Sequence, residues 1–467
     1  MNPQEKMKIA RHDVPTQNPD IRRTNYAEVA EGYDEKLAVE EAQRCLMCKN
    51  PLCMQGCPVS INIPGFIAEM AKGNFEKAAS IIKETNSLPA VCGRVCPQEN
   101  QCEKYCIVGK KSKPVAIGAL ERFAADYDRL SGKTPEIIIP PSTKHKIAVI
   151  GAGPAGLTAS GSLAKMGHQV TVFEAFHEAG GVLIYGIPEF RLPKGIVRAE
   201  IQLLEKLGVE FAFNTLIGRT TNVEELIAAG YESIFVAPGA GLPVFMHLPG
   251  ENLCGIYSAN EFLTRVNLMK AYQFPKYDTP IYCGKKVAVI GGGNTAMDAA
   301  RTAARMNPEA VYIIYRRSEE EMPARLEEVH HAKEEGIQFL TLHNPVGYQG
   351  NDNGWVTGME CVRMELGEPD ASGRRRPVTI PGSNFMLDVD TVIVAIGAKS
   401  NDLIMKTTPG LEVNKWGYLV VDPVTQMTTR PGIFAGGDIA SQEATVISAM
   451  GQGRRAACHM DEYLRQK

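Results

Sequence analysis

KIAVIGAGPAGLTAS, residues 146–160, is the stretch of sequence that decides the fold of this chain. Its first five residues predict a buried strand, and the rest predicts a glycine turn that begins a helix. The turn fits G-x-G-x-x-G, in which missing side chains let backbone amides approach a pyrophosphate at a helix N-terminus. Glycine turns also join strands to helices for packing reasons alone, so one copy is weak evidence. The predicted contacts in this turn are Gly151, Gly153, Pro154, Ala155 and Gly156.

A second version of the pattern, KVAVIGGGNTAMDAA, covers residues 286–300. After each copy, predicted strands and helices alternate, which implies parallel sheets with right-handed crossovers. The duplication predicts an α/β fold with two nested Rossmann-like dinucleotide-binding domains, the second inserted into the first. We expect the first domain to comprise residues 147–242 and 399–467, and the inserted domain to comprise residues 243–398.

The first unit has the features of a flavin site. Glu174 ends the predicted second strand, where an acidic residue accepts hydrogen bonds from an adenosine ribose. In GIFAGGD, Asp438 can reach the ribityl and pyrophosphate groups, and the helix that begins near Thr445 can direct amides at the flavin ring. A second glycine turn precedes VLIYGIPEFRLPK, which we expect to line the flavin. The further predicted contacts are Gly181, Val182, Arg191, Gly437 and Val446.

The second unit differs from the first at the end of its second strand. VYIIYRR ends in Arg316 and Arg317, at the position where the first unit has an acidic residue. Two guanidinium groups suit a 2′-phosphate through bidentate hydrogen bonds, so we predict NADP here rather than NAD. The alternative is that the two arginines are a solvated strand end. The glycine-turn residues of this unit are Gly291, Gly292, Gly293, Asn294, Thr295 and Ala296.

Two nested sites of this kind predict a flavoprotein that exchanges hydride with a nicotinamide, with the flavin, FAD, doing the chemistry. No catalytic side chain is therefore assigned. A disulfide reductase of this architecture would carry a redox cysteine pair shortly after the first unit's second strand. Residues 175–200 contain no cysteine, so we expect electrons to leave the flavin by another route.

The size and composition of the chain limit its possible functions. Its 467 residues predict two to four domains. A net charge of −3 gives no reason to expect a nucleic acid or an anionic membrane as partner. No run of 18 uncharged apolar residues occurs, and the first residues lack the apolar core of a signal peptide. We expect a cytoplasmic protein.

Eight of the twelve cysteines lie between Cys45 and Cys106, among segments that predict helices at 61–84 and 118–130. Thiolates spaced by two to five residues, one of them followed by proline, suit [4Fe–4S] clusters. Structural zinc is the alternative, but zinc sites favour paired C-x2-C knuckles and only one is present. We therefore predict a helical iron–sulfur domain at residues 1–132 and a linker at 133–146. Spacing alone leaves open which thiol serves which cluster.

Together these motifs resemble one family, the small (β) chain of NADPH-dependent glutamate synthase. Its relatives include the larger subunit of NADH-dependent reduced ferredoxin:NADP oxidoreductase and the N-terminal half of dihydropyrimidine dehydrogenase. The resemblance covers the chain from about Arg44 onward. The motifs that carry it are RCLMCKNPLCMQGCP, VCGRVCPQENQCEKYC, IGALERF, GAGPAGL, GIPEFRLPK, GGGNTAMD, YRRSEEEMPA and GIFAGGD.

The resemblance implies an assignment of the cluster ligands that spacing left open. It implies one [4Fe–4S] cluster on Cys45, Cys48, Cys53 and Cys106. It implies a second cluster on Cys57, Cys96 and Cys102, with Glu121 as the fourth ligand where dihydropyrimidine dehydrogenase carries a glutamine. Without the resemblance, an exposed helix residue would be the simpler interpretation of Glu121. Cys92 is then a spare buried thiol.

The resemblance also implies the reaction. NADPH gives hydride to FAD, and single electrons pass through the clusters to a second subunit. In glutamate synthase that subunit is the large chain, which forms glutamate from glutamine and 2-oxoglutarate. The main alternative is an electron-bifurcating transhydrogenase subunit whose partner is a ferredoxin-reductase-like flavoprotein. A non-catalytic assembly scaffold is a third, which Arg316, Arg317 and the two intact glycine turns disfavour.

Overall fold

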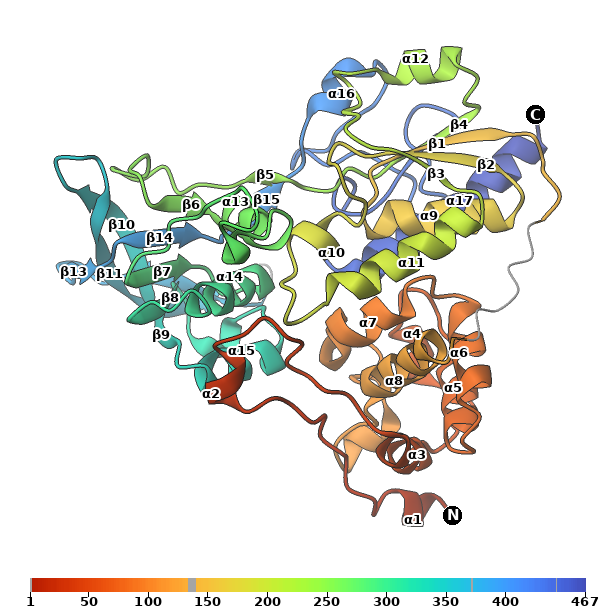
Figure 1. Ribbon diagram of the computed structural model, residues 1–467, viewed down its shortest axis with the longest axis horizontal. Helices are drawn as coiled ribbons and strands as arrows, with labels where there is room; N and C mark the ends of the chain where they lie inside the picture. The colour runs from red at the N-terminus through yellow and green to blue at the C-terminus, as the bar shows by residue number, and fades with distance from the viewer. Residues whose placement is uncertain (1, 133–139, 371–372, 442) are drawn as a thin grey trace.

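The computed structural model describes residues 2–132, 140–370, 373–441 and 443–467. Residues 133–139 of the predicted linker lie outside this range. Figure 1 shows a helical domain below two α/β units, with the chain passing from the helical domain into the upper right unit and then into the left one. No helix in the described ranges has both the length and the apolar character needed to cross a membrane.

The helical domain contains short helices separated by the two cysteine-rich segments. The helix pair predicted at 61–84 is present and breaks at Gly73, whose φ of +78° lies in the left-handed region that ends helices. Buried faces of these helices share one hydrophobic core with the first α/β unit. The helices are α1 Pro3–Lys6, α2 Pro19–Arg22, α3 Glu35–Gln43, α4 Leu52–Gln55, α5 Ile63–Met70, α6 Phe75–Lys83, α7 Pro89–Val95, η1 Gln98–Asn100, η2 Ile107–Lys110 and α8 Ile117–Leu130.

The first unit is a parallel sheet in the order β16-β4-β1-β2-β3. Its strands are short apolar runs because helices cover both faces, as the alternation of strands and helices predicts. The strands are β1 Lys146–Ile150, β2 Gln169–Phe173, β3 Glu210–Ala212, β4 Ser233–Val236 and β16 Ile433–Ala435. The helices are α9 Pro154–Lys165, α10 Val182–Tyr185, α11 Lys194–Lys206, α12 Val223–Ala228, α16 Leu403–Thr407 and α17 Val446–Arg465.

The second unit repeats this order as β14-β7-β8-β9, with β6 on the outer edge of β14. The predicted duplication, with one unit nested in the other, is therefore present. The strands are β6 Ile256–Ser258, β7 Lys286–Ile290, β8 Ala310–Tyr315, β9 Gln338–Thr341 and β14 Thr391–Val394. The helices are α13 Ala259–Asn267, η3 Ala271–Gln273, α14 Asn294–Ala304, η4 Glu319–Glu321 and α15 Leu326–Glu334.

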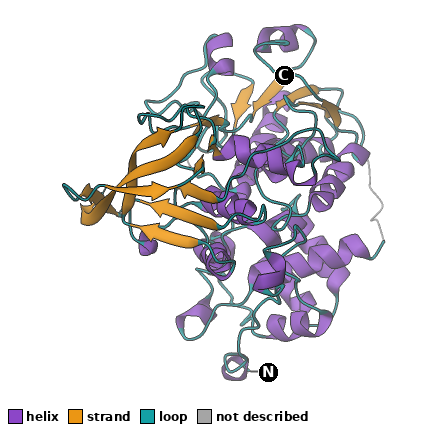
Figure 2. Cartoon of the chain, turned by 60° about the vertical axis from the view of Figure 1, so that its left-hand side comes forward, coloured by secondary structure: helices purple, strands orange, loops and turns teal. Residues whose placement is uncertain are grey.

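An antiparallel sheet in the second unit was not predicted. It comprises β10 His343–Gly350, β11 Val356–Pro369, β12 Arg375–Thr379 and β13 Phe385–Asp388. Its buried side chains, among them Met359 and Cys361, pack on one face of the parallel sheet. The sheet takes the place of covering helices there. Figure 2 shows these strands spread together on one side of the molecule, away from the helical domain.

The chain crosses between the two units on a pair of short antiparallel strands. These are β5 Leu242–Pro243 on the way out and β15 Ala398–Lys399 on the way back, with Leu242 opposite Lys399. The expected ends of the inserted domain, at residues 243 and 398, stay a prediction. The crossings leave the two parallel sheets as separate bodies, each with its own hydrophobic core.

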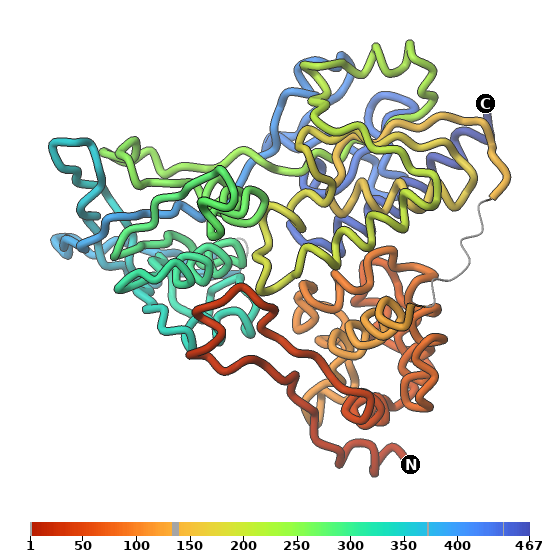
Figure 3. Tube along the Cα trace, viewed as in Figure 1, coloured from red at the N-terminus to blue at the C-terminus, as the bar shows by residue number. Residues whose placement is uncertain are grey.

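The N-terminal residues form an arm that reaches the second unit. Figure 3 shows the arm leave the helical domain, pass beside the second unit and return to α3. Arg22 is 1% exposed and donates to Glu335 at 3.0 Å and to Glu334 at 2.5 Å. Tyr26 stacks on Tyr272 with ring centroids 4.0 Å apart. The arm thus joins the helical domain to the second unit.

Replacing Arg22 with alanine should loosen this arm. Hydrogen bonds between charged groups contribute about 1.5–3 kcal/mol, and we expect a loss of stability in that range with faster proteolysis of the arm. Thermal unfolding and limited proteolysis measure both effects. The matched control is Arg23→Ala. Arg23 is half exposed and lies 3.8 Å from the exposed Asp20, and a surface ion pair of this kind contributes little to stability. Equal behaviour of the two variants would show that the arm is not held through Arg22.

Candidate dinucleotide and thiol sites

The first glycine turn is shaped by close backbone approaches. Gly151 has a φ of +100°, and a Cβ there would overlap the carbonyl oxygen of Ala237. A Cβ on Gly156 would overlap the Gly151 carbonyl oxygen, so this glycine lets helix α9 pack on strand β1. Gly153 differs, since a Cβ there would meet no described heavy atom within 4 Å. It precedes α9 as N-cap without a side-chain cap, which leaves open space at the helix N-terminus.

Glu174 lies beside this turn. Its carboxylate accepts hydrogen bonds from the amides of Ala152 at 2.8 Å and Phe176 at 2.9 Å, and burial raises its pKa. Burial, with a smaller contribution from the carboxylates of Glu174 and Asp438, raises the pKa of Tyr185 to about 12. Burial raises the pKa of Asp438 as well.

The other predicted contacts of the first unit surround the same turn. A Cβ on Gly181 would lie 2.8 Å from the Gly153 Cα, so the second glycine turn closes against the first. Val182 begins α10, and Thr445 caps α17 by accepting from the Ser448 amide at 3.3 Å. Gly437 has a φ of +78° and donates its amide to Gln452 at 2.7 Å. The remaining predicted contacts of this turn and helix are Pro154, Ala155 and Val446.

The second glycine turn has the same form. Gly291 has a φ of +142°, and a Cβ there would overlap the Ala395 carbonyl oxygen. Gly293 caps α14 without a side-chain bond, and the nearest atom to a Cβ there would be a Pro323 side-chain carbon at 3.9 Å. A Cβ on Gly292 would meet the Tyr315 ring at 2.6 Å. Thr295 is exposed at the helix start, and Ala296 is buried.

The two arginines at the end of β8 have different surroundings. Arg317 is buried, donating to Asp370 at 2.7 Å and to the Arg375 carbonyl at 2.8 Å. Arg316 is exposed. The arginine pair predicted from sequence is therefore divided, with one side chain at the surface and one inside.

Arg191 connects the two units. Its guanidinium is 2.7 Å from both carboxylate oxygens of Asp298 and 3.1 Å from Glu328. Both carboxylates belong to the second unit. Ion pairs of Arg191 therefore join the FRLPK segment of the first unit to the second unit. The expected contact of Arg191 with the flavin stays a prediction. Lys194, the first residue of α11, is buried and donates to the carbonyls of Leu183 and Leu192 at 2.9 and 3.1 Å.

Four thiols line one small cavity in the helical domain. The cavity has a volume of about 30 Å³ and is otherwise walled by apolar side chains, Ile63 and Val115 among them. Burial raises the pKa of Cys53 to about 12, and nearby thiols add to this shift. The thiols that share the cavity are Cys45, Cys48, Cys53 and Cys106.

Three other thiols lie near Glu121, deeper in the domain. Cys57, Cys96 and Cys102 are buried, and Glu121 is 5% exposed. Burial is the main cause that raises the pKa of Cys57 and of Cys102, and the nearby Glu121 and Cys96 raise both pKa values further. Burial raises the pKa of Cys57 to about 11 and that of Glu121 to about 8. No three His, Cys, Asp or Glu side chains in the described ranges meet the geometry of a single metal ion.

Asn86 is a neighbour that sequence reasoning missed. Its amide donates to Glu121 at 2.6 Å, and its carbonyl oxygen accepts from the Leu88 amide at 2.9 Å. Cys92 lies against the same carbonyl oxygen at 3.7 Å and against the Met450 sulfur at 3.5 Å. Cys92 is fully buried, as expected of a spare thiol. No local pattern marks a buried asparagine of this kind.

Helix α17 joins the thiol region to the first glycine turn. A Cβ on Gly451 would lie 2.7 Å from the Pro58 carbonyl oxygen, next to Cys57. A Cβ on Gly453 would overlap the Ala155 carbonyl oxygen in α9. Two glycines in one helix thus bring it close to both regions, and the same hydrophobic core encloses them.

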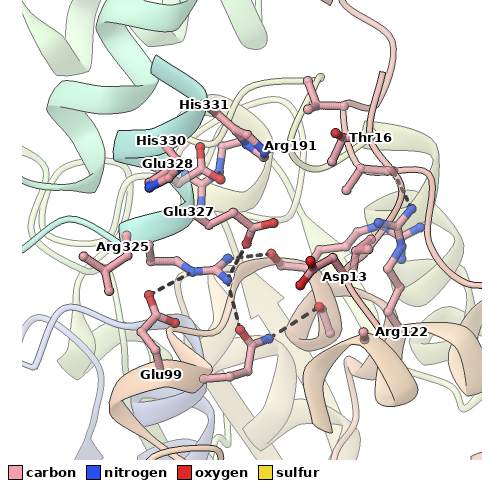
Figure 4. Close-up of a pocket in the computed structure, with 18 of the residues that line it drawn as sticks. Asp13, Thr16, Glu99, Arg122, Arg191, Arg325, Glu327, Glu328, His330 and His331 are labelled. Atoms are coloured by element: carbon pink, nitrogen blue, oxygen red, sulfur yellow. Dashed lines mark hydrogen bonds and ion pairs between the residues drawn. The ribbon is translucent and has the colours of Figure 1, made fainter. Parts of the chain in front are cut away.

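A larger cavity of about 560 Å³ lies between the arm, the helical domain and the second unit. Figure 4 shows Arg325 extended across it toward Glu99. The backbone amide of Arg325 donates to Asn294 at 2.9 Å, and its guanidinium donates to the Arg94 carbonyl at 3.0 Å and to Gln98 at 3.1 Å. Arg325 therefore joins the second glycine turn to the cysteine-rich segment. Sequence reasoning missed it because these contacts span more than 200 residues.

Family models match both parts of the chain. A dihydropyrimidine dehydrogenase domain II, 4Fe-4S cluster family matches residues 22–133, and a pyridine nucleotide-disulphide oxidoreductase family matches residues 145–453. Among solved structures, the chain is similar to Mycobacterium tuberculosis FprA in complex with NADPH, with a TM-score of 0.56 and 19% identity over 69% of this chain and 85% of that one. It is also similar to thioredoxin reductase of T. acidophilum, with a TM-score of 0.51 and 19% identity over 69% and 99% of the two chains. These two similarities establish the fold of the nested units.

Curated relatives match most of the chain. The NADP(+)-dependent formate dehydrogenase subunit beta of Moorella thermoacetica is 40% identical over 89% of this chain, which spans 60% of that subunit. The glutamate synthase [NADPH] small chain of Escherichia coli is 37% identical over 96% of both chains. That of Azospirillum brasilense is 37% identical over 96% of this chain and 93% of its own length. The resemblance seen in the motifs is confirmed: this chain belongs to the family of NADPH-dependent glutamate synthase small chains, oxidoreductases that join a 4Fe-4S domain to a pyridine nucleotide domain.

Proposed function

We propose that this chain is the electron-delivering subunit of a glutamate synthase, with FAD in the first unit, NADPH in the second and two [4Fe–4S] clusters in the helical domain. The observation that carries the proposal is the position of α17, whose Gly451 and Gly453 bring the first glycine turn and the Cys57 segment into one core. When bound, FAD accepts hydride and releases electrons singly, and the clusters carry single electrons.

The two glycine turns have room for a dinucleotide. A Cβ on Gly153 would have no described heavy atom within 4 Å of it. A Cβ on Gly293 would have a single side-chain carbon, at 3.9 Å. Both residues precede helices whose first amides lack a side-chain cap, so these amides can donate to a pyrophosphate. Glu174, already turned toward the first turn, would accept from a ribose hydroxyl there.

The thiol positions support the proposed ligand sets. Cys45, Cys48, Cys53 and Cys106 line one cavity and would hold one cluster. Cys57, Cys96, Cys102 and Glu121 would hold the other. The protein would hold both sites at fixed positions, and it buries the Cys57 site, where burial raises the pKa values of Cys57 and Glu121.

Arg316 is the residue we propose for the 2′-phosphate of NADPH, because Arg317 is engaged by Asp370 and by the Arg375 carbonyl. The change Arg316→Ala should raise the KM for NADPH about tenfold or more, since a charge-assisted hydrogen bond contributes about 1.5–3 kcal/mol, and should leave the KM for NADH unchanged. Steady-state kinetics with a dye acceptor measures both constants. An unchanged KM for NADPH would contradict the assignment. Arg317→Ala is the comparison, with an expected loss of stability.

The partner separates the glutamate synthase proposal from a second candidate. Several relatives are named as β subunits of other NADP-dependent enzymes, including the formate dehydrogenase subunit at 40% identity, and they favour the same electron delivery to another partner. Copurification of the chain from its native cells, followed by identification of the bound subunit, tests the proposal. We expect a glutamate synthase large chain. A formate dehydrogenase subunit or a ferredoxin-reductase-like flavoprotein would overturn that assignment.

A further inference from the structure

Glu121 is a buried carboxylate that differs from its counterparts in the helical domain. Two other buried glutamates there are paired with arginines, Glu41 with Arg44 at 2.6 Å and Glu103 with Arg11 at 2.7 Å. In the described residues, burial raises the pKa of Glu121 to about 8, and a single neutral hydrogen-bond donor acts against this shift. A buried charge is costly unless it is paired or bound to a metal. Glu121 therefore lacks the counter-charge that a buried carboxylate needs, and the proposed cluster would supply it.

The neutral donor is Asn86, whose side-chain nitrogen lies 2.6 Å from a carboxylate oxygen of Glu121. The side-chain oxygen of Asn86 is also engaged, since it accepts from the Leu88 amide at 2.9 Å. An amide that uses its oxygen in this way presents its nitrogen, and so its N–H groups, to the carboxylate. Asn86 is 0% exposed, so both of its hydrogen bonds are shielded from bulk solvent.

Backbone packing fixes the place where these two side chains meet. Asn86 lies between α6 and α7, and Cys96 follows the last residue of α7. A Cβ on Gly93 in α7 would lie 2.6 Å from the backbone nitrogen of Arg122 in α8. The two helices therefore approach closely at the residue next to Glu121. The contact between Asn86 and Glu121 is thus held by the fold and not by two mobile side chains.

We propose that Asn86 is a positioning residue that sets the reduction potential of the cluster proposed for Cys57, Cys96, Cys102 and Glu121. The proposal rests on the proposed function, which supplies that cluster. The hydrogen bond from Asn86 engages one carboxylate oxygen of Glu121 and would leave the other to bind iron. Reduction by one electron adds negative charge to a cluster and its ligands, and a hydrogen bond donated to a ligand oxygen stabilises this charge. Asn86 therefore makes the cluster easier to reduce.

Two substitutions separate the donor group of Asn86 from its structural role. Asn86→Asp keeps the shape of the side chain and the oxygen that accepts from Leu88, but it replaces the donor with a second carboxylate oxygen. Asn86→Ser also keeps an oxygen for the turn, because serine hydroxyls form the same kind of turn, but its side chain is too short to reach Glu121. A purely structural role of Asn86 predicts an unchanged cluster potential in both variants.

The two variants should change the potential in a fixed order. At a fixed applied potential, Asn86→Ser should lower the ratio of reduced to oxidised cluster about tenfold, which corresponds to a shift of about 59 mV for one electron. Asn86→Asp should lower the ratio further, because a second carboxylate repels the added electron. Redox titration of the whole iron-loaded chain, followed by electron paramagnetic resonance, measures both shifts.

Ser87→Ala is the matched control. Ser87 lies next to Asn86 in the same turn, and its hydroxyl donates to Thr158 at 3.3 Å rather than to Glu121. We expect this variant to keep the potential of the unmodified chain. Ser87→Ala and Asn86→Ser should both bind the full amount of iron and sulfide, because neither substitution removes a proposed ligand.

Equal potentials in the unmodified chain and both Asn86 variants would overturn the role of Asn86, and so would a shift of the same size in Ser87→Ala. Glu121→Ala tests the proposed ligand set separately, because it should alter the resonance or the iron content of the same cluster. If it altered neither, the ligand set would be wrong and the proposal for Asn86 would fall with it. If Glu121→Ala altered the cluster and the Asn86 variants did not, the ligand set would stand and the role of Asn86 alone would be refuted.

Discussion

Replacing Cys57 with serine is expected to remove about half of the iron and sulfide bound to the chain. Cys57 is buried beside Cys96, Cys102 and Glu121, and loss of one thiolate leaves three ligands for a cluster that needs four. The cavity of the other four thiols is lined by different residues, so its cluster should remain. Iron and sulfide analysis, with electron paramagnetic resonance of the reduced chain, measures the change.

Cys92 is the matched control for this experiment. It is more buried than Cys57, at 0% against 9% exposed, and lies in the same domain. Its sulfur contacts the Met450 sulfur and the Asn86 carbonyl oxygen, and its hydrogen bond with Cys96 raises the pKa of Cys96. We expect Cys92→Ser to keep the full iron content, with some loss of stability because the site is apolar on one side. If Cys92→Ser lost half of the iron and Cys57→Ser did not, the second ligand set would be wrong. Loss of all iron in Cys57→Ser would show that the two sites are not independent.

Gly156→Ala and Gly153→Ala should fail in different ways. A Cβ at Gly156 would overlap the Gly151 carbonyl oxygen, so helix α9 must move off β1, and we expect a loss of stability of about 3 kcal/mol. Gly153 has a φ of −79° and open space at its Cβ, so its variant should fold with a stability change within about 1 kcal/mol. The added methyl group would instead fill the space proposed for the pyrophosphate, and flavin affinity should fall about tenfold or more.

Thermal unfolding of the flavin-free chain and flavin titration separate these two effects. The expected result is a large shift in unfolding for Gly156→Ala alone, and a large shift in affinity for Gly153→Ala with little change in unfolding. A Gly153→Ala variant that retained full flavin affinity would show that the open space at this turn is not where the dinucleotide binds. Gly291 and Gly293 offer the same comparison in the second unit, with NADPH as ligand.

Much of the fold followed from local patterns. Helices predicted from periodicity appear within a few residues of their predicted ends, as for the helix expected at 118–130, which is α8 Ile117–Leu130. The antiparallel strands β10–β13 were missed, although β11 alternates buried and exposed residues in part. The duplication had favoured a second copy of the parallel pattern, and nothing local marks a sheet that replaces covering helices.

The candidate sites were predicted unevenly. The positions of the glycines followed from sequence because a positive φ and a close backbone approach are requirements of the turn itself. The sequence predicted one shared role for Arg316 and Arg317. Their environments differ because Arg317 alone contacts Asp370, which follows β11, and the carbonyl of Arg375, which begins β12 of the unpredicted sheet. Arg191 was expected near the flavin, but its charge is balanced by carboxylates of a different unit.

By itself, the sequence determined the two glycine turns, the alternation of strands and helices, and the abundance of thiols before the first turn. Each of these depends on residues that are neighbours in the chain. The tertiary structure alone decided that Arg325 joins a glycine turn to the cysteine-rich segment and that the arm holds the second unit through Arg22. Such contacts form only when packing of the whole chain brings distant segments together, and no local pattern of residues specifies them.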